Sequence, residues 1–309
     1  MKTNQQTFSR RALARIFAAT WLAMAVSQPG FAAPADISDV PMAVLNSAKP
    51  NVMFTLDDSG SMQFEVIPEN DDVYLTFPRP RTLYGSAYYG SNWEDASYAR
   101  HARFTTNNRY ARCYRNAQCN PMYYNPATRY RPWSNADGSL MANATPTAAY
   151  YNPYNPAEGT RNLTTNQTDR RRWTNDDGSS TYEDVTYYPA THFRYTGGGA
   201  APTAAGAANN TAANYTQVQI TAGNAPYTKG ARRTDCAGTT CTYAEEIQNF
   251  ANWFTYYRSR ILAARAGVGL AFSRLPDGSM RTGFAAINKG NTTIDGQANT
   301  STIVRGVRL

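Results

Sequence analysis

Four stretches of the chain have a regular pattern of apolar positions. Residues 51–56 (NVMFTL) form a nearly continuous apolar run that stops at a cluster of Asp, Ser and Gly, which is typical of a buried strand followed by a loop. Residues 281–287 and 303–308 have the composition of two further strands, separated by a segment rich in turn residues. Apolar residues also recur at steps of three and four, as on one face of a helix, at Ile247, Phe250, Phe254, Tyr257 and Ile261.

Both ends of this long helix carry recognisable signals. Thr242 and Glu245 have the spacing of a capping box, with Thr242 as the N-cap and Glu245 reaching back. We expect the helix to run to Phe272 or Leu275, because Pro-Asp-Gly follows at 276–278. The predicted order is strand, large insertion, long helix, strand, turn and strand, which indicates an α/β sheet.

The insertion, from about residue 66 to residue 241, has a different composition. Tyr, Asn, Thr, Pro, Gly and Ala dominate it, and long apolar periodicity is absent. Residues 133–139 (WSNADGS) are echoed by residues 173–179 (WTNDDGS), and each copy contains the tight-turn dipeptide Asp-Gly. We therefore expect two related hairpins with a tryptophan on one arm of each, and a flexible loop over 196–214.

Residues 1–33 have the organisation of a secretory signal peptide. Residues 1–15 contain four basic residues and no acid, residues 16–26 are apolar, and small residues follow near position 33. The apolar stretch is too short to span a bilayer. We expect the mature chain, residues 34–309, to be exported to the periplasm or cell surface and not to cross the membrane.

Charge and cysteine content narrow the choice of partners. The formal net charge of +8 falls to +4 when the four basic leader residues are removed, and no basic stripe stands out beyond 170–172, so a nucleic-acid partner is not expected. Cysteines occur in two close pairs, and an even count in an exported chain predicts disulfides rather than a zinc site. The predicted pairs are Cys113 with Cys119 and Cys236 with Cys241.

The strongest candidate for chemistry is the loop after the first strand. Asp57, Ser59 and Ser61 place a carboxylate and two hydroxyls at alternating positions, and Gly60 lets the backbone turn tightly between the two serines. Oxygen ligands of this kind favour Mg²⁺, Mn²⁺ or Ca²⁺ over zinc or copper. A cation held there keeps a position open for an oxygen of a partner, which is adhesion chemistry and breaks no bond. The alternative is an ordinary polar turn.

Residues 51–62 (NVMFTLDDSGSM) resemble the first strand and metal-ion-dependent adhesion loop of a von Willebrand factor A (vWA) domain. Residues 245–272, 281–288 and 302–309 are similar to the PilY/PilC family of type IV pilus tip-associated adhesins, as are the leader and the Tyr/Asn/Pro-rich insertion. The resemblance implies a vWA-like (Rossmann-like) sheet and a role in pilus assembly, twitching motility and attachment, with minor pilins and host or abiotic surfaces as partners.

The same resemblance assigns Asp57, Ser59 and Ser61 as the first-loop metal ligands. A complete vWA site also takes a Thr and an Asp from later loops, and the family carries a C-terminal β-propeller. Neither the two later-loop ligands nor the β-propeller has a counterpart before Leu309. We therefore expect a sheet that is incomplete at its C-terminus, in a fragment of a longer protein.

Two other functions compete with adhesion. A subtilisin-like hydrolase would pair Asp57 or Asp58 with a histidine in a Gly-rich context, and neither His101 nor His192 has that context. A secreted glycan-binding or structural module without a metal site would offer the aromatic faces of the insertion to sugars, although burial in a core explains the same residues. The tryptophans concerned are Trp93, Trp133 and Trp173. We expect a non-enzymatic adhesin.

Overall fold

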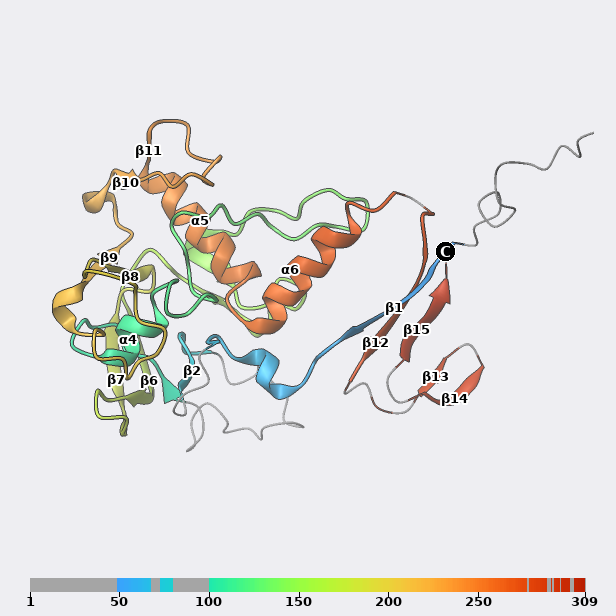
Figure 1. Ribbon diagram of the computed structural model, residues 1–309, viewed down its shortest axis with the longest axis horizontal. Coiled ribbons are helices and arrows are strands. Elements are labelled where there is room, and N and C mark those ends of the chain that lie inside the picture. Colours follow the sequence, from blue (N-terminus) through green and yellow to red (C-terminus); the bar gives the residue numbers. More distant parts are fainter. Residues whose placement is uncertain are drawn as a thin grey trace, which may run out of the picture. The chain divides into compact units, whose positions relative to one another are not determined.

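The computed structural model describes residues 49–67, 73–79, 100–276, 278–287, 290, 292–294, 296–300 and 303–308 (Figure 1). The predicted leader and Trp93 lie outside these residues. Residues Pro50–Leu309 form one compact unit. Its architecture is mixed α/β with several small sheets, which confirms the predicted class in its coarse form.

The strands are β1 (Asn51–Leu56), β2 (Val73–Leu75), β3 (Arg100–His101), β4 (Ala149–Tyr150), β5 (Thr160–Arg161), β6 (Gln167–Thr174), β7 (Ser180–Tyr187), β8 (Thr191–Tyr195), β9 (Tyr215–Gln219), β10 (Tyr227–Thr228), β11 (Thr240–Cys241), β12 (Arg281–Ala286), β13 (Thr292–Ile294), β14 (Gln297–Thr300) and β15 (Ile303–Arg308). The α-helices are α4 (Arg109–Tyr114), α5 (Tyr243–Tyr256) and α6 (Arg260–Phe272). Short 3₁₀ turns are η1 (Gly60–Gln63), η3 (Pro146–Ala148), η4 (Pro156–Glu158), η5 (Ala212–Asn214) and η6 (Ala222–Asn224).

The three predicted strands form one sheet, in the order β1-β12-β15 (Figure 1). β1 runs parallel to β12, in register from its first residue to its last, and β15 is antiparallel to β12. Helix α6 packs on one face, where the Phe54 and Phe272 rings meet edge to face with centroids 5.8 Å apart. On the other face the side chains of Met53 and Val307 lie close over Gly283, where an added Cβ would come within 3.0 Å of both.

The parallel pair needs a long crossover, and nearly the whole chain between β1 and β12 supplies it. Within that crossover β2, β3, β6 and β7 form a second sheet, in that order. The described part of the insertion also contains three antiparallel pairs, β4-β5, β8-β9 and β10-β11. The predicted flexible loop at 196–214 joins β8 to β9, and buried Asn210 within it accepts hydrogen bonds from Arg112.

The predicted long helix is two helices. Its start is confirmed: the Glu245 N–H donates to Thr242 Oγ1, and Glu245 Oε2 accepts from the Thr242 N–H, which is the predicted capping box. The expectation of one helix to Phe272 is wrong, because α5 ends at Tyr256 and α6 begins at Arg260. Between them Arg258 turns inward and is 1% exposed, with its Nε atom 2.9 Å from Glu65 Oε1.

The two sequence repeats form matching turns, as predicted. In the first, the Asn135 N–H donates to the Ser139 carbonyl, and Ser139 donates twice to Asp137 Oδ1. In the second, Asn175, Asp177 and Ser179 make the same bonds. The glycine of each copy has a positive φ, +80° at 138 and +91° at 178.

The core of the insertion is aromatic. Trp133 is 3% exposed and Trp173 is fully buried, so these two tryptophans serve packing rather than offering open faces to sugars. Helix α5 contributes a further aromatic set to this core, and the segment from 123 to 151 faces it. The principal members are Phe77, Tyr123, Tyr124, Tyr151, Phe250, Trp253 and Phe254.

Both predicted disulfides form. Cys113 pairs with Cys119 across a Cα–Cα distance of 5.1 Å, and Cys236 with Cys241 across 5.0 Å. The second bond closes the turn before β11, which pairs with β10. The first joins α4 to the loop that follows it.

Candidate functional site

The loop that carries the predicted metal ligands follows β1 directly. Because β1 and β12 are parallel, their carboxyl ends meet at one edge of the sheet, and the loop lies there. Residues 60–63 form the turn η1, with Ser59 as its N-cap in extended conformation. Asp57 and Ser59 are half-buried, whereas Asp58 and Ser61 are exposed.

The structure brings Asp57, Ser59 and Ser61 together. The Ser59 N–H donates to Asp57 Oδ1 at 2.8 Å, and the hydroxyl oxygens of Ser59 and Ser61 lie 3.1 Å apart. Hydrogen bonds from the Ser59 backbone and hydroxyl lower the pKa of Asp57, which keeps the carboxylate anionic near neutral pH. The donor set is therefore one anionic carboxylate and two hydroxyls, all hard oxygen ligands that suit a divalent cation.

Two arginines, Arg79 and Arg260, hold the backbone of the segment that leaves this loop. Arg79 donates to the Gln63 carbonyl at 2.7 Å. The backbone N–H of Arg260 donates to the Phe64 carbonyl, and its guanidinium donates to the Val66 carbonyl at 2.8 and 3.1 Å. The first turn of α6 is thus tied to the exit of the candidate loop, which fixes the loop from a point nearly 200 residues later in the chain.

Glu65 is the centre of this attachment. Its carboxylate accepts from the Thr76 and Phe77 N–H groups, from the Arg79 guanidinium and from Arg258, and it is 1% exposed. Burial alone would raise the pKa of Glu65, but the charges of Arg79 and Arg258 outweigh it and lower the pKa to about 2. No local sequence pattern predicts this cluster, because its members are separated by up to 193 positions.

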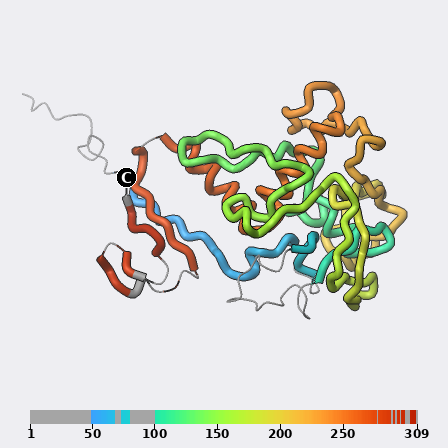
Figure 2. Tube along the Cα trace, turned by 180° about the vertical axis from the view of Figure 1, so that it is seen from behind, coloured from blue at the N-terminus to red at the C-terminus, as the bar shows by residue number. Residues whose placement is uncertain are grey.

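A mainly apolar pocket of about 370 Å³ adjoins the candidate loop. Leu56 and Asp58 line it at the end of β1, with Phe284 and Ala286 from β12 and the α6 residues Ile261, Arg265 and Val268. The insertion adds Trp133 and Tyr154, whose ring centroids are 5.3 Å apart. In Figures 1 and 2 the green segment that includes residues 133–141 runs beside α6, and Gly269 of α6 faces the backbone of Ser134.

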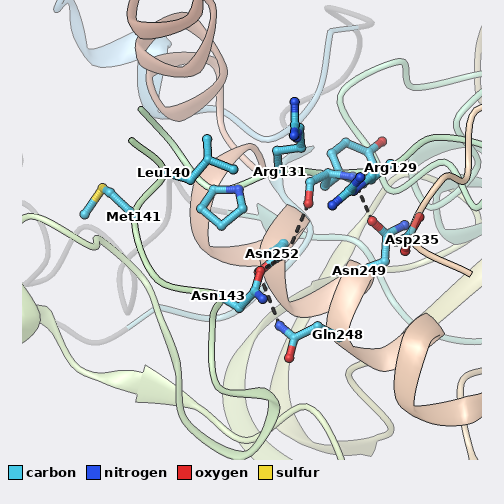
Figure 3. A pocket seen from close by; sticks show the side chains of 11 residues that line it. Arg129, Arg131, Leu140, Met141, Asn143, Asp235, Gln248, Asn249 and Asn252 are labelled. Atoms are coloured by element: carbon cyan, nitrogen blue, oxygen red, sulfur yellow. Dashed lines mark hydrogen bonds between the residues drawn. The ribbon is translucent and has the colours of Figure 1, made fainter. Parts of the chain in front are cut away.

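A second, more polar pocket of about 260 Å³ lies along α5 (Figure 3). Asn252 bridges Asn143, Gln248 and the Tyr130 carbonyl, and Asn249 binds the backbone of 128–130. These amides fasten two loops of the insertion to the helix, so most of their hydrogen-bonding capacity is used within the protein.

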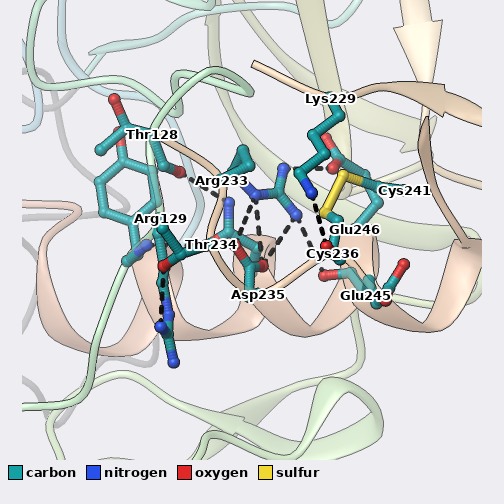
Figure 4. Close-up of polar contacts among 12 residues, drawn as sticks. Thr128, Arg129, Lys229, Arg233, Thr234, Asp235, Cys236, Cys241, Glu245 and Glu246 are labelled. Carbon is teal, nitrogen blue, oxygen red and sulfur yellow. Dashed lines mark hydrogen bonds and ion pairs between the residues drawn. A yellow bond between two sulfur atoms is a disulfide. The ribbon is translucent and has the colours of Figure 1, made fainter. Parts of the chain in front are cut away.

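Next to it, an ion-pair network secures the start of α5 (Figure 4). The buried Arg233 guanidinium lies between Glu246, at 2.5 Å, and Asp235, at 3.0 Å. Lys229 donates to the carbonyls of Cys236 and Gly238, beside the disulfide. Each of these charged side chains therefore has a partner within the protein, and the network stabilises the fold at this end of the helix.

Other potential ligands are placed elsewhere. Within the described ranges, no three His, Cys, Asp or Glu side chains form a group that could hold a metal ion. His101 and His192 are both buried, in β3 and β8, and burial lowers their pKa values to about 3 and about 4. His101 packs against Trp173 and His192 against Tyr124.

None of the helices in the described part of the chain has the length and apolar character needed to cross a bilayer. No family model matches the chain, and no solved structure matches it.

Curated relatives do match. The chain is 27% identical over 277 residues to the type IV pilus biogenesis factor PilY1 of Pseudomonas aeruginosa strain PAK, a match that covers 87% of this chain and 18% of the relative. It is 24% identical over 286 residues to PilY1 of strain PAO1, covering 89% of this chain and 19% of the relative. The chain thus spans about a fifth of the length of these relatives. Over most of its own length, it is a homologue of the type IV pilus biogenesis factor PilY1.

Proposed function

We propose that this chain is an extracytoplasmic factor of type IV pilus biogenesis and surface attachment, and that it grips its partner through a divalent cation bound by Asp57, Ser59 and Ser61. The observation that carries the proposal is the convergence of these three oxygen donors at the carboxyl end of β1, in a homologue of PilY1. Minor pilins and host or abiotic surfaces are the proposed partners.

The sheet topology supports a vWA-like arrangement. A first strand ends in the candidate loop, a helical crossover leads to a parallel neighbour, and an antiparallel strand follows. In this proposal residues 66–241 are an insertion between the loop and the helix. The two disulfides agree with an oxidising location outside the cytoplasm.

The proposed chemistry needs no catalytic group. Mg²⁺, Mn²⁺ or Ca²⁺ accepts six or more oxygen ligands, of which this loop offers three. Water and an oxygen of the partner, such as a carboxylate, complete the coordination sphere. Attachment then depends on the cation and is released by chelation.

Mn²⁺ titration of the purified full chain tests the loop. Asp57→Ala removes the only carboxylate of the proposed ligand set, so we expect at least about a ten-fold loss of affinity, while Asp58→Ala loses much less. The same two variants are then compared for twitching and surface piliation in a strain that lacks the native gene. Equal Mn²⁺ isotherms for Asp57→Ala and the parent chain would refute the metal assignment.

A further inference from the structure

The pocket beside the candidate loop has two features that the metal proposal does not use. Its walls come from four parts of the chain that are far apart in sequence: the end of β1, the 133–154 region of the insertion, α6 and β12. It is lined mainly by apolar and aromatic side chains, yet it opens to the surface. Tyr154, on its rim, is 64% exposed, whereas most other aromatic side chains among the described residues are buried or half-buried.

The inner wall is rigid. Trp133 is 3% exposed, donates its indole N–H to the Tyr256 carbonyl at 2.8 Å and packs edge to face on the Tyr256 ring. Its hairpin is closed by the repeated Asn-Ala-Asp-Gly-Ser turn. A preformed aromatic surface of this kind binds an apolar side chain without first having to be ordered.

The rim carries two charged side chains, Asp58 after β1, which already has an interaction within the protein, and Arg265 on α6. Arg265 lies one turn after Ile261 on α6, and its guanidinium is exposed and makes no hydrogen bond or ion pair with any described residue. By contrast, Arg258, just before this helix, bonds Glu65, and Arg260, at its first position, bonds the Val66 carbonyl. An apolar pocket with an available guanidinium at its edge is complementary to a large apolar side chain next to a carboxylate.

We propose that this pocket is a docking site for a protein segment that inserts one aromatic or branched aliphatic side chain between Tyr154, Trp133 and α6, and places an adjacent carboxylate on Arg265. A glycan fits less well, because few convergent polar groups line the walls. The pocket needs no cation for this contact, so the proposal goes beyond the metal-dependent grip and stands without it.

The test uses the full chain with ¹⁵N-labelled tryptophan and N-acetyl-Phe-Glu-amide as the probe, in EDTA. The Trp133 indole signal should shift saturably, while the signals of buried Trp173 and Trp253 stay in place. N-acetyl-Ala-Glu-amide and N-acetyl-Phe-Gln-amide should each bind at least about three-fold more weakly, since each lacks one of the two contacts.

Variants assign the contacts. Tyr154→Ala and Arg265→Glu should each weaken binding of N-acetyl-Phe-Glu-amide at least about three-fold. Tyr150→Ala and Arg274→Glu are the matched controls, because both residues are exposed and neither lines the pocket. Both controls should bind like the parent chain.

Two results would overturn the docking site. One is a Trp133 signal that does not move through a millimolar titration. The other is a Trp133 shift that follows protein concentration without any peptide, which would assign the pocket to a second copy of the chain. Neither result affects the Mn²⁺ isotherms, and failure of the metal site leaves the titration in EDTA unchanged, so the two proposals fail separately.

Discussion

At the scale of single residues, the clearest energetic statement concerns Glu65. Replacement by Gln keeps the shape but leaves the buried charges of Arg79 and Arg258 without a counter-charge. We expect Glu65→Gln to lower the free energy of unfolding by about 3–5 kcal/mol, measured by urea denaturation. Asp184→Asn is the matched control, since it removes a carboxylate from an ion pair with Arg170 that is 57% exposed on both sides, and it should cost less than about 1 kcal/mol.

If Glu65→Gln and Asp184→Asn lower the free energy of unfolding equally, the buried ion pairs of Glu65 do not stabilise the fold more than an exposed pair. No sequence pattern predicts Glu65 as the hub. Glu65 follows the turn η1, where a glutamate is ordinary, and its arginine partners come from positions 79 and 258. Pairing over such separations depends on the fold as a whole.

A buried histidine sets a second expectation, for pH. Burial, followed by the charge of Arg194, lowers the pKa of His192 from 6.5 to about 4 in the folded state. Between these two values the unfolded chain binds more protons than the folded chain, so stability is complete above about pH 6.5 and falls as the pH drops towards 4. For each such histidine, the free energy of unfolding falls by up to about 2 kcal/mol between about pH 6.5 and about pH 5.

His192→Phe keeps the ring contact with Tyr124 and removes the titration. Urea midpoints measured from about pH 7.5 to about pH 5 should therefore decline less steeply for His192→Phe than for the parent chain. The residual slope in this range is expected from His101, whose pKa is shifted in the same direction, whereas Glu65 adds to the loss only below about pH 4.5. Parallel slopes for variant and parent would contradict the assignment to His192.

At the scale of elements, the two repeated turns allow a comparison within one molecule. Gly138 and Gly178 occupy the same turn position with positive φ, so alanine is strained at both and should cost about 1 kcal/mol. A Cβ at 138 meets nothing within 4 Å, whereas a Cβ at 178 would lie 3.0 Å from the Tyr110 hydroxyl. Gly178→Ala should therefore be the more destabilising of the two in thermal or urea unfolding.

Gly206→Ala is the control, because its φ is not positive and its Cβ would meet nothing within 4 Å. It should leave stability nearly unchanged. A loss at 206 equal to that at 138 would mean that the cost comes from glycine replacement in general and not from the turn.

Elements with local signals could be predicted from the sequence, and those fixed by distant contacts could not. The strand at 51–56, the capping box at Thr242 and the paired Asp-Gly turns each depend on residues within a few positions of one another, and all three are found in the structure. The break between α5 and α6 has no Pro or Gly to mark it. It arises because Arg258 leaves the helical face to reach Glu65, a partner 193 positions away.

At the scale of the whole molecule, the candidate site combines both kinds of information. The sequence predicts which three oxygens gather after β1, because they are neighbours in the loop. It does not predict what holds the loop in place, nor the pocket beside it, since Trp133 and Tyr154 arrive there only when the insertion folds against α6. The pocket beside the candidate loop is thus built partly from the insertion.

The attachment of the loop exit to α6 can be tested at one residue. The guanidinium of Arg260 donates two hydrogen bonds to the Val66 carbonyl, and Arg260→Met removes both while keeping much of the apolar stem. The exit of the loop then gains freedom, and the loop must be re-ordered when it binds a cation. We expect Mn²⁺ affinity to fall roughly three- to ten-fold, which corresponds to about 1 kcal/mol of lost loop restraint.

Arg265→Met is the matched control, because Arg265 lies on the same helix and makes no hydrogen bond to the loop among the described residues. It should leave the Mn²⁺ isotherm unchanged and affect only binding of the acidic peptide. If Arg260→Met also leaves the isotherm unchanged, the three oxygens are ordered by their own turn, and α6 does not position the cation. If only Arg260→Met weakens it, cation binding depends on the contact between α6 and the exit of the loop, and the apparent Mn²⁺ affinity of the parent chain should fall in urea before the protein unfolds.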